Sequence, residues 1–182
     1  MRLHEMEEMI GSLILYALML FFVIISVGRW KNFSGLLSKL GIKKSNFPKE
    51  LATAAVFFFI LFAVSVIVEM VMTGAGFSED AQQVGNILKH SNPLELLIVL
   101  SVASFVEEFF FRGYLQRKTG LLFAAFVFGY FHIIYGSLSE MVGAFFLGIV
   151  LGIEYNKTKN LIAPILSHFF YNLAIMLLVF GL

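Results

Sequence analysis

Apolar and polar positions alternate along the chain in long blocks, with runs of Leu, Ile, Val, Ala and Phe between short polar stretches. A helix of about 20 apolar residues is needed to cross the roughly 30 Å hydrocarbon core of a bilayer. The pattern therefore predicts six membrane helices, over residues 10–28, 51–68 (extended past Glu69), 93–115, 120–135, 141–153 and 161–182. The expected fold is all-α, a polytopic membrane protein in which residues 1–182 form one integral membrane domain.

The composition supports this expectation. Hydrophobic residues make up 59% of the chain, charged residues only 14%, and the mean hydropathy is +0.89. A soluble domain cannot bury so much apolar surface, so the solvent around the protein is expected to be largely lipid. The chain has no cysteine, which excludes disulfides and thiolate metal sites, and its net charge of +1 gives no indication of a nucleic-acid partner.

The basic residues predict the orientation. All but Arg2 and Lys89 of the 13 Lys and Arg residues fall at alternate connections between the predicted helices. Positively charged loops remain preferentially in the cytoplasm. We therefore expect a plasma-membrane protein with both termini on the non-cytoplasmic side. The basic connections contain Arg29, Lys31, Lys39, Lys43, Lys44 and Lys49, then Arg112, Arg117 and Lys118, then Lys157 and Lys159.

A few polar side chains lie inside the predicted helices, and they gather at one depth. They are Glu107, Glu108 and Arg112 on the third helix, His132 on the fourth, and His168 with Asn172 on the sixth. With a rise of 1.5 Å per residue, the acids, histidines and amide lie about 12 to 18 Å from the same membrane face. Ionisable residues at such depth usually serve a function, so three helices are expected to meet at a site.

The spacing of these residues predicts partners. Glu108 and Arg112 are four residues apart and face each other, whereas Glu107 is turned about 100° away. Taken singly, the Glu108–Arg112 pair is a structural brace, a membrane histidine is a hydrogen-bonding group, and Asn172 is a helix-packing residue. Taken together they favour a reactive site, in which Glu107 is a general base and the imidazoles and amide position water and stabilise an oxyanion.

Three motifs resemble those of a known family. EEFFFR at 107–112 is similar to the EExxxR motif of the CPBP intramembrane proteases, which include CAAX proteases and bacteriocin-processing enzymes. FGYFH at 128–132 and HFFYN at 168–172 match the family's FxxxH and HxxxN motifs, in the family's order. Residues 93–182 thus carry the motif core, and the first two helices match only as generic spans.

The resemblance implies an intramembrane endopeptidase that processes C-terminal tails of prenylated or hydrophobic peptides at the cytoplasmic side. It implies Glu107 as the residue that activates water, with His132 beside it. It also implies that His168 and Asn172 stabilise the oxyanion, and that Glu108 and Arg112, with Phe128 behind His132, support the site. Membrane lipid and a peptide or prenylated protein are the expected partners.

The sequence leaves two questions open: whether a metal ion takes part, and which class of function the site serves. Glu107, His132 and His168 are a ligand set of the kind that binds catalytic zinc, but a glutamate that ligates zinc does not easily act as the free base. We predict metal-free chemistry, with zinc as the alternative. A transporter or proton relay would also bury Glu and His, although it would usually show broken helices in two repeats. A non-catalytic immunity or interaction protein on the same scaffold is the other alternative.

Overall fold

The computed structural model describes residues 3–27 and 33–181, and every regular element within these ranges is a helix. The all-α prediction is therefore confirmed for the described part of the chain. Arg2, Arg29 and Lys31, which contributed to the predicted orientation, lie outside the described residues.

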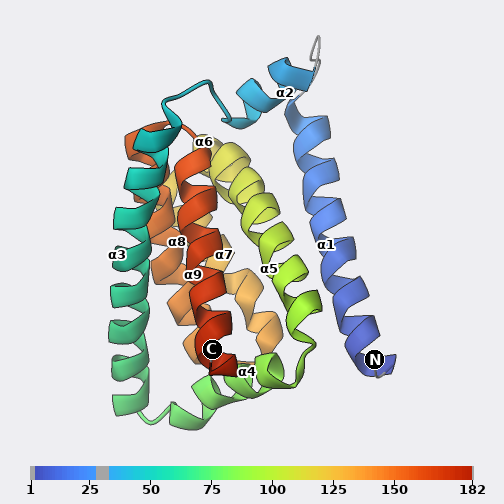
Figure 1. The fold of residues 1–182 in the computed structure, drawn as a ribbon, viewed down its shortest axis with the longest axis vertical. Helices are drawn as coiled ribbons and strands as arrows, with labels where there is room; N and C mark the ends of the chain where they lie inside the picture. Colours follow the sequence, from blue (N-terminus) through green and yellow to red (C-terminus); the bar gives the residue numbers. More distant parts are fainter. Residues whose placement is uncertain (1–2, 28–32, 182) are drawn as a thin grey trace.

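Long helical segments cover each of the predicted runs (Figure 1). In chain order they are α1 (Leu3–Val27), α3 (Phe47–Gly74), α5 (Pro93–Glu107), α7 (Leu121–Phe131), α8 (Leu138–Thr158) and α9 (Ile162–Phe180). The structure adds two helices that the sequence pattern did not predict, α2 (Phe33–Leu40) and α4 (Ser78–His90). Their sequences lack a long apolar run, and they lie across opposite ends of the bundle. Both marked chain ends are at the end that holds α4.

The number of membrane spans is only partly supported. Three helices are long and apolar enough to cross a bilayer, namely α3, α8 and α9. Residues 11–26 and 121–135 form shorter apolar helices, and α5 ends at Glu107 after 15 residues. The six-span count is therefore not confirmed, although the chain is a membrane protein by the character of its helices. Large apolar side chains face outward along several of them, for example Phe59, Met70, Leu94, Leu122 and Ile134, each at least 67% exposed.

Short polar residues begin the helices around the site. The Asn92 side chain accepts hydrogen bonds from the Leu94 and Glu95 amides at 3.0 and 3.3 Å, and Pro93 occupies the first turn of α5. At the start of α8, Ser137 Oγ accepts the Glu140 amide at 3.0 Å. These caps set the points at which α5 and α8 enter the bundle.

Asp80 ties the end helix α4 to the start of α8. Its Oδ2 accepts the Ser139 amide at 2.7 Å and the Ser137 hydroxyl at 3.2 Å. The hydrogen bond from the Ser139 amide is the main reason why the pKa of Asp80 lies below its usual value. The Asp80 carboxylate thus fixes α4 to the start of α8, which follows η2 (His132–Tyr135), the short 3₁₀ turn after α7.

Glycines allow α7 and α8 to pack closely behind the site. A Cβ atom on Gly129 would lie 2.8 Å from the Met141 carbonyl oxygen and 2.8 Å from Phe145 Cβ. A Cβ on Gly148 would lie 3.2 Å from Ala125 Cα. Small residues at such crossings let helix backbones approach in a membrane. This contact places Phe128 of α7 beside the backbone of α8.

We expect Gly129→Ala to destabilise the protein by about 1–3 kcal/mol, because the added methyl group meets backbone that cannot move aside easily. Gly143→Ala is the matched control, since a Cβ there would have nothing within 4 Å. That control should be neutral or gain up to about 1 kcal/mol from the better helix propensity of Ala. Thermal unfolding in detergent measures both, and equal shifts for the two variants would show that the α7–α8 contact is not tight.

Candidate active site

The helix that carries the glutamate pair changes its winding at the pair. The α-helix α5 ends at Glu107, a π-helical segment η1 (Glu108–Leu115) follows, and α6 (Gln116–Thr119) resumes the α-helical turn. Short π-helical segments within α-helices occur frequently at functional sites. The predicted helix 93–115 is therefore continuous but not uniform. Both glutamates are buried at the junction, Glu107 at 9% exposure and Glu108 at 0%.

Glu108 and Arg112 form a buried ion pair, as their spacing predicts. Arg112 Nη1 donates to Glu108 Oε1 at 2.8 Å, and neither side chain is more than 2% exposed. Arg112 Nη2 donates to the Gly148 carbonyl at 3.2 Å, and the guanidinium carbon lies 4.6 Å from the centre of the Phe128 ring. The guanidinium of Arg112 thus contacts a carboxylate of its own helix η1, a backbone carbonyl of α8 and an aromatic ring of α7. Removal of its partner would leave the buried guanidinium without the carboxylate that it bonds directly.

His168 joins this pair from α9. Its Nδ1 lies 3.0 Å from Glu108 Oε1, the same oxygen that accepts from Arg112. A carboxylate oxygen that is ionised can only accept, so Nδ1 carries the proton, and in the neutral imidazole Nε2 then carries a lone pair. Nε2 faces Glu107, with 3.9 Å between it and Glu107 Oε2. Glu108 therefore orients the imidazole towards the other glutamate.

Glu107 is the more accessible of the two acids. Its side chain is 12% exposed, whereas that of Glu108 is fully buried. Glu107 Oε1 accepts a hydrogen bond from Tyr16 of α1 at 3.4 Å. Tyr16 was not among the predicted site residues, because a single tyrosine in an apolar run carries no spacing signal. Glu107 thus lies against Tyr16 and His168, whereas Arg112 bonds Glu108.

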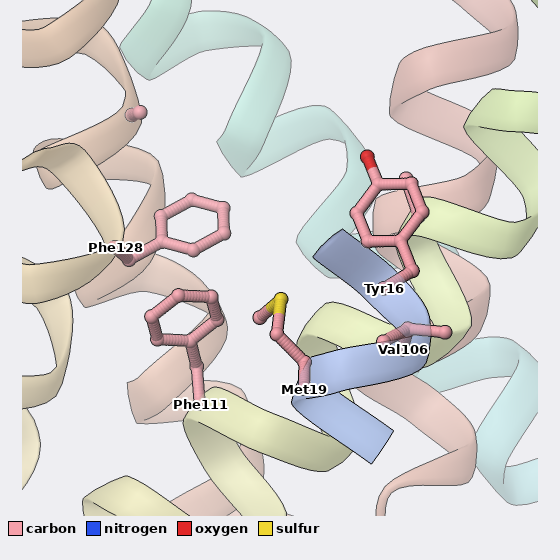
Figure 2. Packing of buried hydrophobic residues seen from close by; sticks show 7 residues of the cluster. Tyr16, Met19, Val106, Phe111 and Phe128 are labelled. Carbon is pink, nitrogen blue, oxygen red and sulfur yellow. The ribbon is translucent and has the colours of Figure 1, made fainter. Parts of the chain in front are cut away.

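An apolar cluster packs beside the site (Figure 2). Tyr16 and Met19 of α1 lie next to Val106, the residue before Glu107, and the rings of Phe111 and Phe128 lie together on the other side. The two rings meet edge to face with centroids 4.9 Å apart. Phe111 and Phe128 of this cluster also lie beside the Arg112 guanidinium, whose carbon is 5.9 and 4.6 Å from their ring centres.

His132 lies at the end of α7, where the helix tightens into η2. Its Nδ1 lies 2.8 Å from the Phe128 carbonyl oxygen, which can only accept, so this nitrogen also carries the proton. The ring is 4.7 Å from the Phe128 ring and within electrostatic range of Glu140 on α8. Phe128 therefore contacts Arg112, His132 and, with centroids 6.1 Å apart, His168. The structure places His132 in the same region as the acids, one ring away from His168.

Asn172 lies one turn beyond His168 and reaches α5. Its Nδ2 donates to Ser104 Oγ at 3.1 Å, and Ser104 in turn donates to the Leu100 carbonyl at 2.8 Å. Ser104 is fully buried three residues before Glu107. One of the two amide protons of Asn172 is thus used for helix packing, and the other is available to a neighbouring group. Ser104 was missed because a serine in an apolar helix is common.

Glu154 is a further buried acid that the sequence analysis passed over. It is fully buried in α8, and its Oε2 accepts the Ser167 hydroxyl at 2.6 Å. On the same helix, the Gly152 carbonyl accepts a hydrogen bond from Gln116 at 2.9 Å. The fifth predicted run stops at Ile153, one residue before Glu154. The signal that pointed to Glu107, an acid in an apolar helix, applies to Glu154 as well.

The proposed zinc ligands do not form a metal-binding cluster. Among the described residues, no group of three or more His, Asp and Glu side chains is arranged to hold a metal ion. Glu107 Oε2 and His168 Nε2 lie 3.9 Å apart, while His132 Nδ1 lies against the Phe128 carbonyl. The residues as placed do not fit the zinc alternative, and we derive no step through a metal.

The region around this site matches a known family of proteases. A family model described as type II CAAX prenyl endopeptidase Rce1-like matches residues 89–174. These residues are Rce1-like. The resemblance that the three motifs indicate is thereby confirmed over this range, and the Rce1-like region contains Glu107, Glu108, Arg112, His132, His168 and Asn172.

A curated relative is similar to part of the chain. The uncharacterized protein YpbD of Bacillus subtilis (strain 168) is 39% identical over 84 residues, which are 44% of this chain and 43% of that protein. The match thus spans less than half the length of the relative. No solved structure matches the chain.

Proposed function

We propose that the protein is an intramembrane endopeptidase of the CAAX type, which hydrolyses a peptide bond near the cytoplasmic face of the membrane. One observation carries the proposal. Glu107, the more accessible acid, faces Nε2 of His168, and the Nδ1 atom of the same ring lies 3.0 Å from the Glu108 carboxylate of the buried Glu108–Arg112 pair. A carboxylate oriented towards a fixed imidazole, inside the Rce1-like region, is suited to general-base chemistry.

The first step is the activation of water. Glu107 Oε2 and His168 Nε2 are both acceptors, and at 3.9 Å they are too far apart to bond each other directly. A water molecule beside them would donate one O–H to each group. Its oxygen would attack the peptide carbonyl carbon while Glu107 takes the proton. Glu107 would then transfer that proton to the departing amine as the C–N bond breaks.

The second requirement is stabilisation of the oxyanion that forms during this attack. We assign this role to the remaining Nδ2 proton of Asn172 and to His132, which can donate from Nε2 when it is protonated. This assignment moves His168 from the oxyanion, where the motif resemblance placed it, to the water. Each oxyanion donor typically contributes about 3 kcal/mol of transition-state stabilisation.

The proposed substrates are prenylated or hydrophobic peptides that approach from the cytoplasm. The direct test is incubation of the purified protein in detergent with a prenylated CAAX peptide, with and without a chelator. We expect release of the C-terminal tripeptide at the same rate in both arms, because the proposed steps use only protein side chains. Activity that chelation removes and zinc restores would contradict the metal-free mechanism but not the protease function. An intact peptide in every arm would contradict the function itself.

The orientation is proposed from the same positive charges that the sequence analysis used. Ser34 lies on α2 and Ser78 begins α4, at opposite ends of the bundle (Figure 1). We expect Ser34→Cys to be labelled by a membrane-impermeant thiol reagent from the cytoplasmic side and Ser78→Cys only from the other side. Since the natural chain has no cysteine, each variant carries a single reactive thiol. Labelling of both variants from one side would contradict the proposed topology.

A further inference from the structure

A basic cavity lies outside the candidate active site, where α1, α2 and the end of η1 meet. It has a volume of about 290 Å³ and is lined by Ser26, Lys39, Gly113, Tyr114, Arg117 and Lys118. Half of the lining residues are cationic and none is acidic. A cavity of this charge would attract an anion.

The cations are positioned by the fold. Arg117 Nη1 donates to the Lys39 carbonyl and, at 3.3 Å, to the Gly113 carbonyl, so α2 and η1 hold the guanidinium between them. Lys118 Nζ lies 4.9 Å from the centre of the Tyr114 ring. An arginine whose guanidinium is already held loses less freedom when it binds an anion.

Gly113 explains why α2 comes so close. A Cβ atom at this position would lie 2.5 Å from the Leu40 carbonyl oxygen, which no side chain could accommodate. The missing side chain lets the end of α2 rest on η1 and brings Lys39 to the rim of the cavity. The close packing of α2 on η1 therefore helps to form the basic cavity, in addition to the basic residues that line it.

The cavity continues into an apolar surface. Phe22, one turn before Ser26 on α1, is 50% exposed, and the neighbouring Ile25 is 62% exposed. The Phe22 ring lies 5.4 Å from the Tyr114 ring and 6.2 Å from the Phe110 ring. An anion-binding site therefore lies directly beside an exposed aromatic surface on an apolar helix. This combination matches a molecule with an anionic head and an acyl chain.

We propose that this cavity binds the phosphate of an anionic phospholipid, with an acyl chain along Phe22 and Ile25. Basic sites between helices at the cytoplasmic face bind such head groups. The inference does not depend on the proposed protease function. The packing also separates the cavity from the active site. Met19 and Val23, 6% and 0% exposed, fill the face of α1 between Tyr16 and Ser26, and Met19 points into the cluster with Phe111 and Phe128 (Figure 2).

The test is native mass spectrometry of the full chain in a non-ionic detergent. Phosphatidylglycerol and phosphatidylcholine with the same acyl chains compete for the protein. We expect retention of phosphatidylglycerol over phosphatidylcholine, and a loss of this preference of about 10-fold or more in Arg117→Gln/Lys118→Gln, since each basic residue near the surface contributes substantially. The matched control is Lys44→Gln/Lys157→Gln, which removes the same charge from residues that do not line the cavity.

Each other outcome overturns the proposal. Equal retention of the two lipids would show that the cavity does not select an anionic head group. An equal loss of preference in the control variant would show that lipid binding depends only on the total positive charge of the protein. Glycerol phosphate that binds as tightly as the lipid would identify a soluble anion as the ligand. Displacement of the lipid by a peptide with a free C-terminal carboxylate, but not by its amide, would assign the cavity to substrate. If the double variant does not fold, the single variant Lys118→Gln is used in its place. It keeps the hydrogen bonds of Arg117 to the Lys39 and Gly113 carbonyls.

Discussion

Replacement of Glu107 by Gln is expected to lower the rate of peptide hydrolysis about 10²- to 10⁴-fold, the usual contribution of a general base. Gln has the same shape and its amide oxygen can still accept from Tyr16, but it cannot take a proton from water. The protein should remain folded, because Glu107 is outside the buried ion pair and its side chain retains 12% exposure. Initial rates of cleavage of a prenylated CAAX peptide measure the effect.

The conservative control for this variant is Glu107→Asp, which keeps a carboxylate but shortens the side chain by one methylene. It should retain part of the activity that Glu107→Gln loses, because the base is present and only its position changes. If Glu107→Gln retains near-wild-type turnover, Glu107 is not the base. If both variants cleave the peptide as fast as the wild-type protein, another residue must activate water.

Replacement of Glu108 by Gln is expected to reduce the free energy of unfolding by about 3–5 kcal/mol, the range for one partner lost from a buried ion pair. Arg112 is 1% exposed and would keep the Gly148 carbonyl and the Phe128 ring as neighbours, neither of which carries a charge. His168 would lose the carboxylate that orients its ring. Activity should therefore fall as well, but together with stability.

Chemical denaturation in mixed micelles measures this loss, and Glu107→Gln is the matched control. This control makes the same substitution one residue earlier, at the more accessible acid. We expect its free energy of unfolding to fall by less than about 1 kcal/mol, because the hydrogen bond from Tyr16 is retained. Equal destabilisation by both substitutions would show that the two glutamates are not divided between a structural and a reactive role. A Glu108→Gln protein as stable as wild type would contradict the buried pair.

Several features of the fold and the site could be predicted from the sequence because they follow from local spacing. Apolar runs predict helices, and a four-residue separation predicts the contact between Glu108 and Arg112. The common depth of Glu107 and His168 predicts that α5 and α9 bring them together, and they lie 3.9 Å apart. These inferences need only helix geometry and the cost of polar groups in lipid.

Other features depend on tertiary contacts that a sequence pattern does not carry. The α-helical period predicts a uniform helix through Leu115, so it could not reveal the π-helical winding of η1. Tyr16 reaches Glu107 from a helix 91 residues earlier in the chain, and no spacing rule links the two. The protonated nitrogen of His168 is set by its contact with Glu108 and could not be inferred from the HxxxN motif. The end helices α2 and α4 are too polar or too short to show a membrane period.

Whether Glu107 activates water for peptide hydrolysis is tested most directly by mass spectrometry of the cleavage products formed in ¹⁸O-labelled water. A prenylated CAAX peptide is incubated with the purified wild-type chain and with Glu107→Gln. We expect a peptide product whose new C-terminal carboxylate contains ¹⁸O, together with the released tripeptide, and a rate at least about 10²-fold lower for the variant. Intact peptide with the wild-type protein, or labelled product formed equally fast by Glu107→Gln, would contradict it.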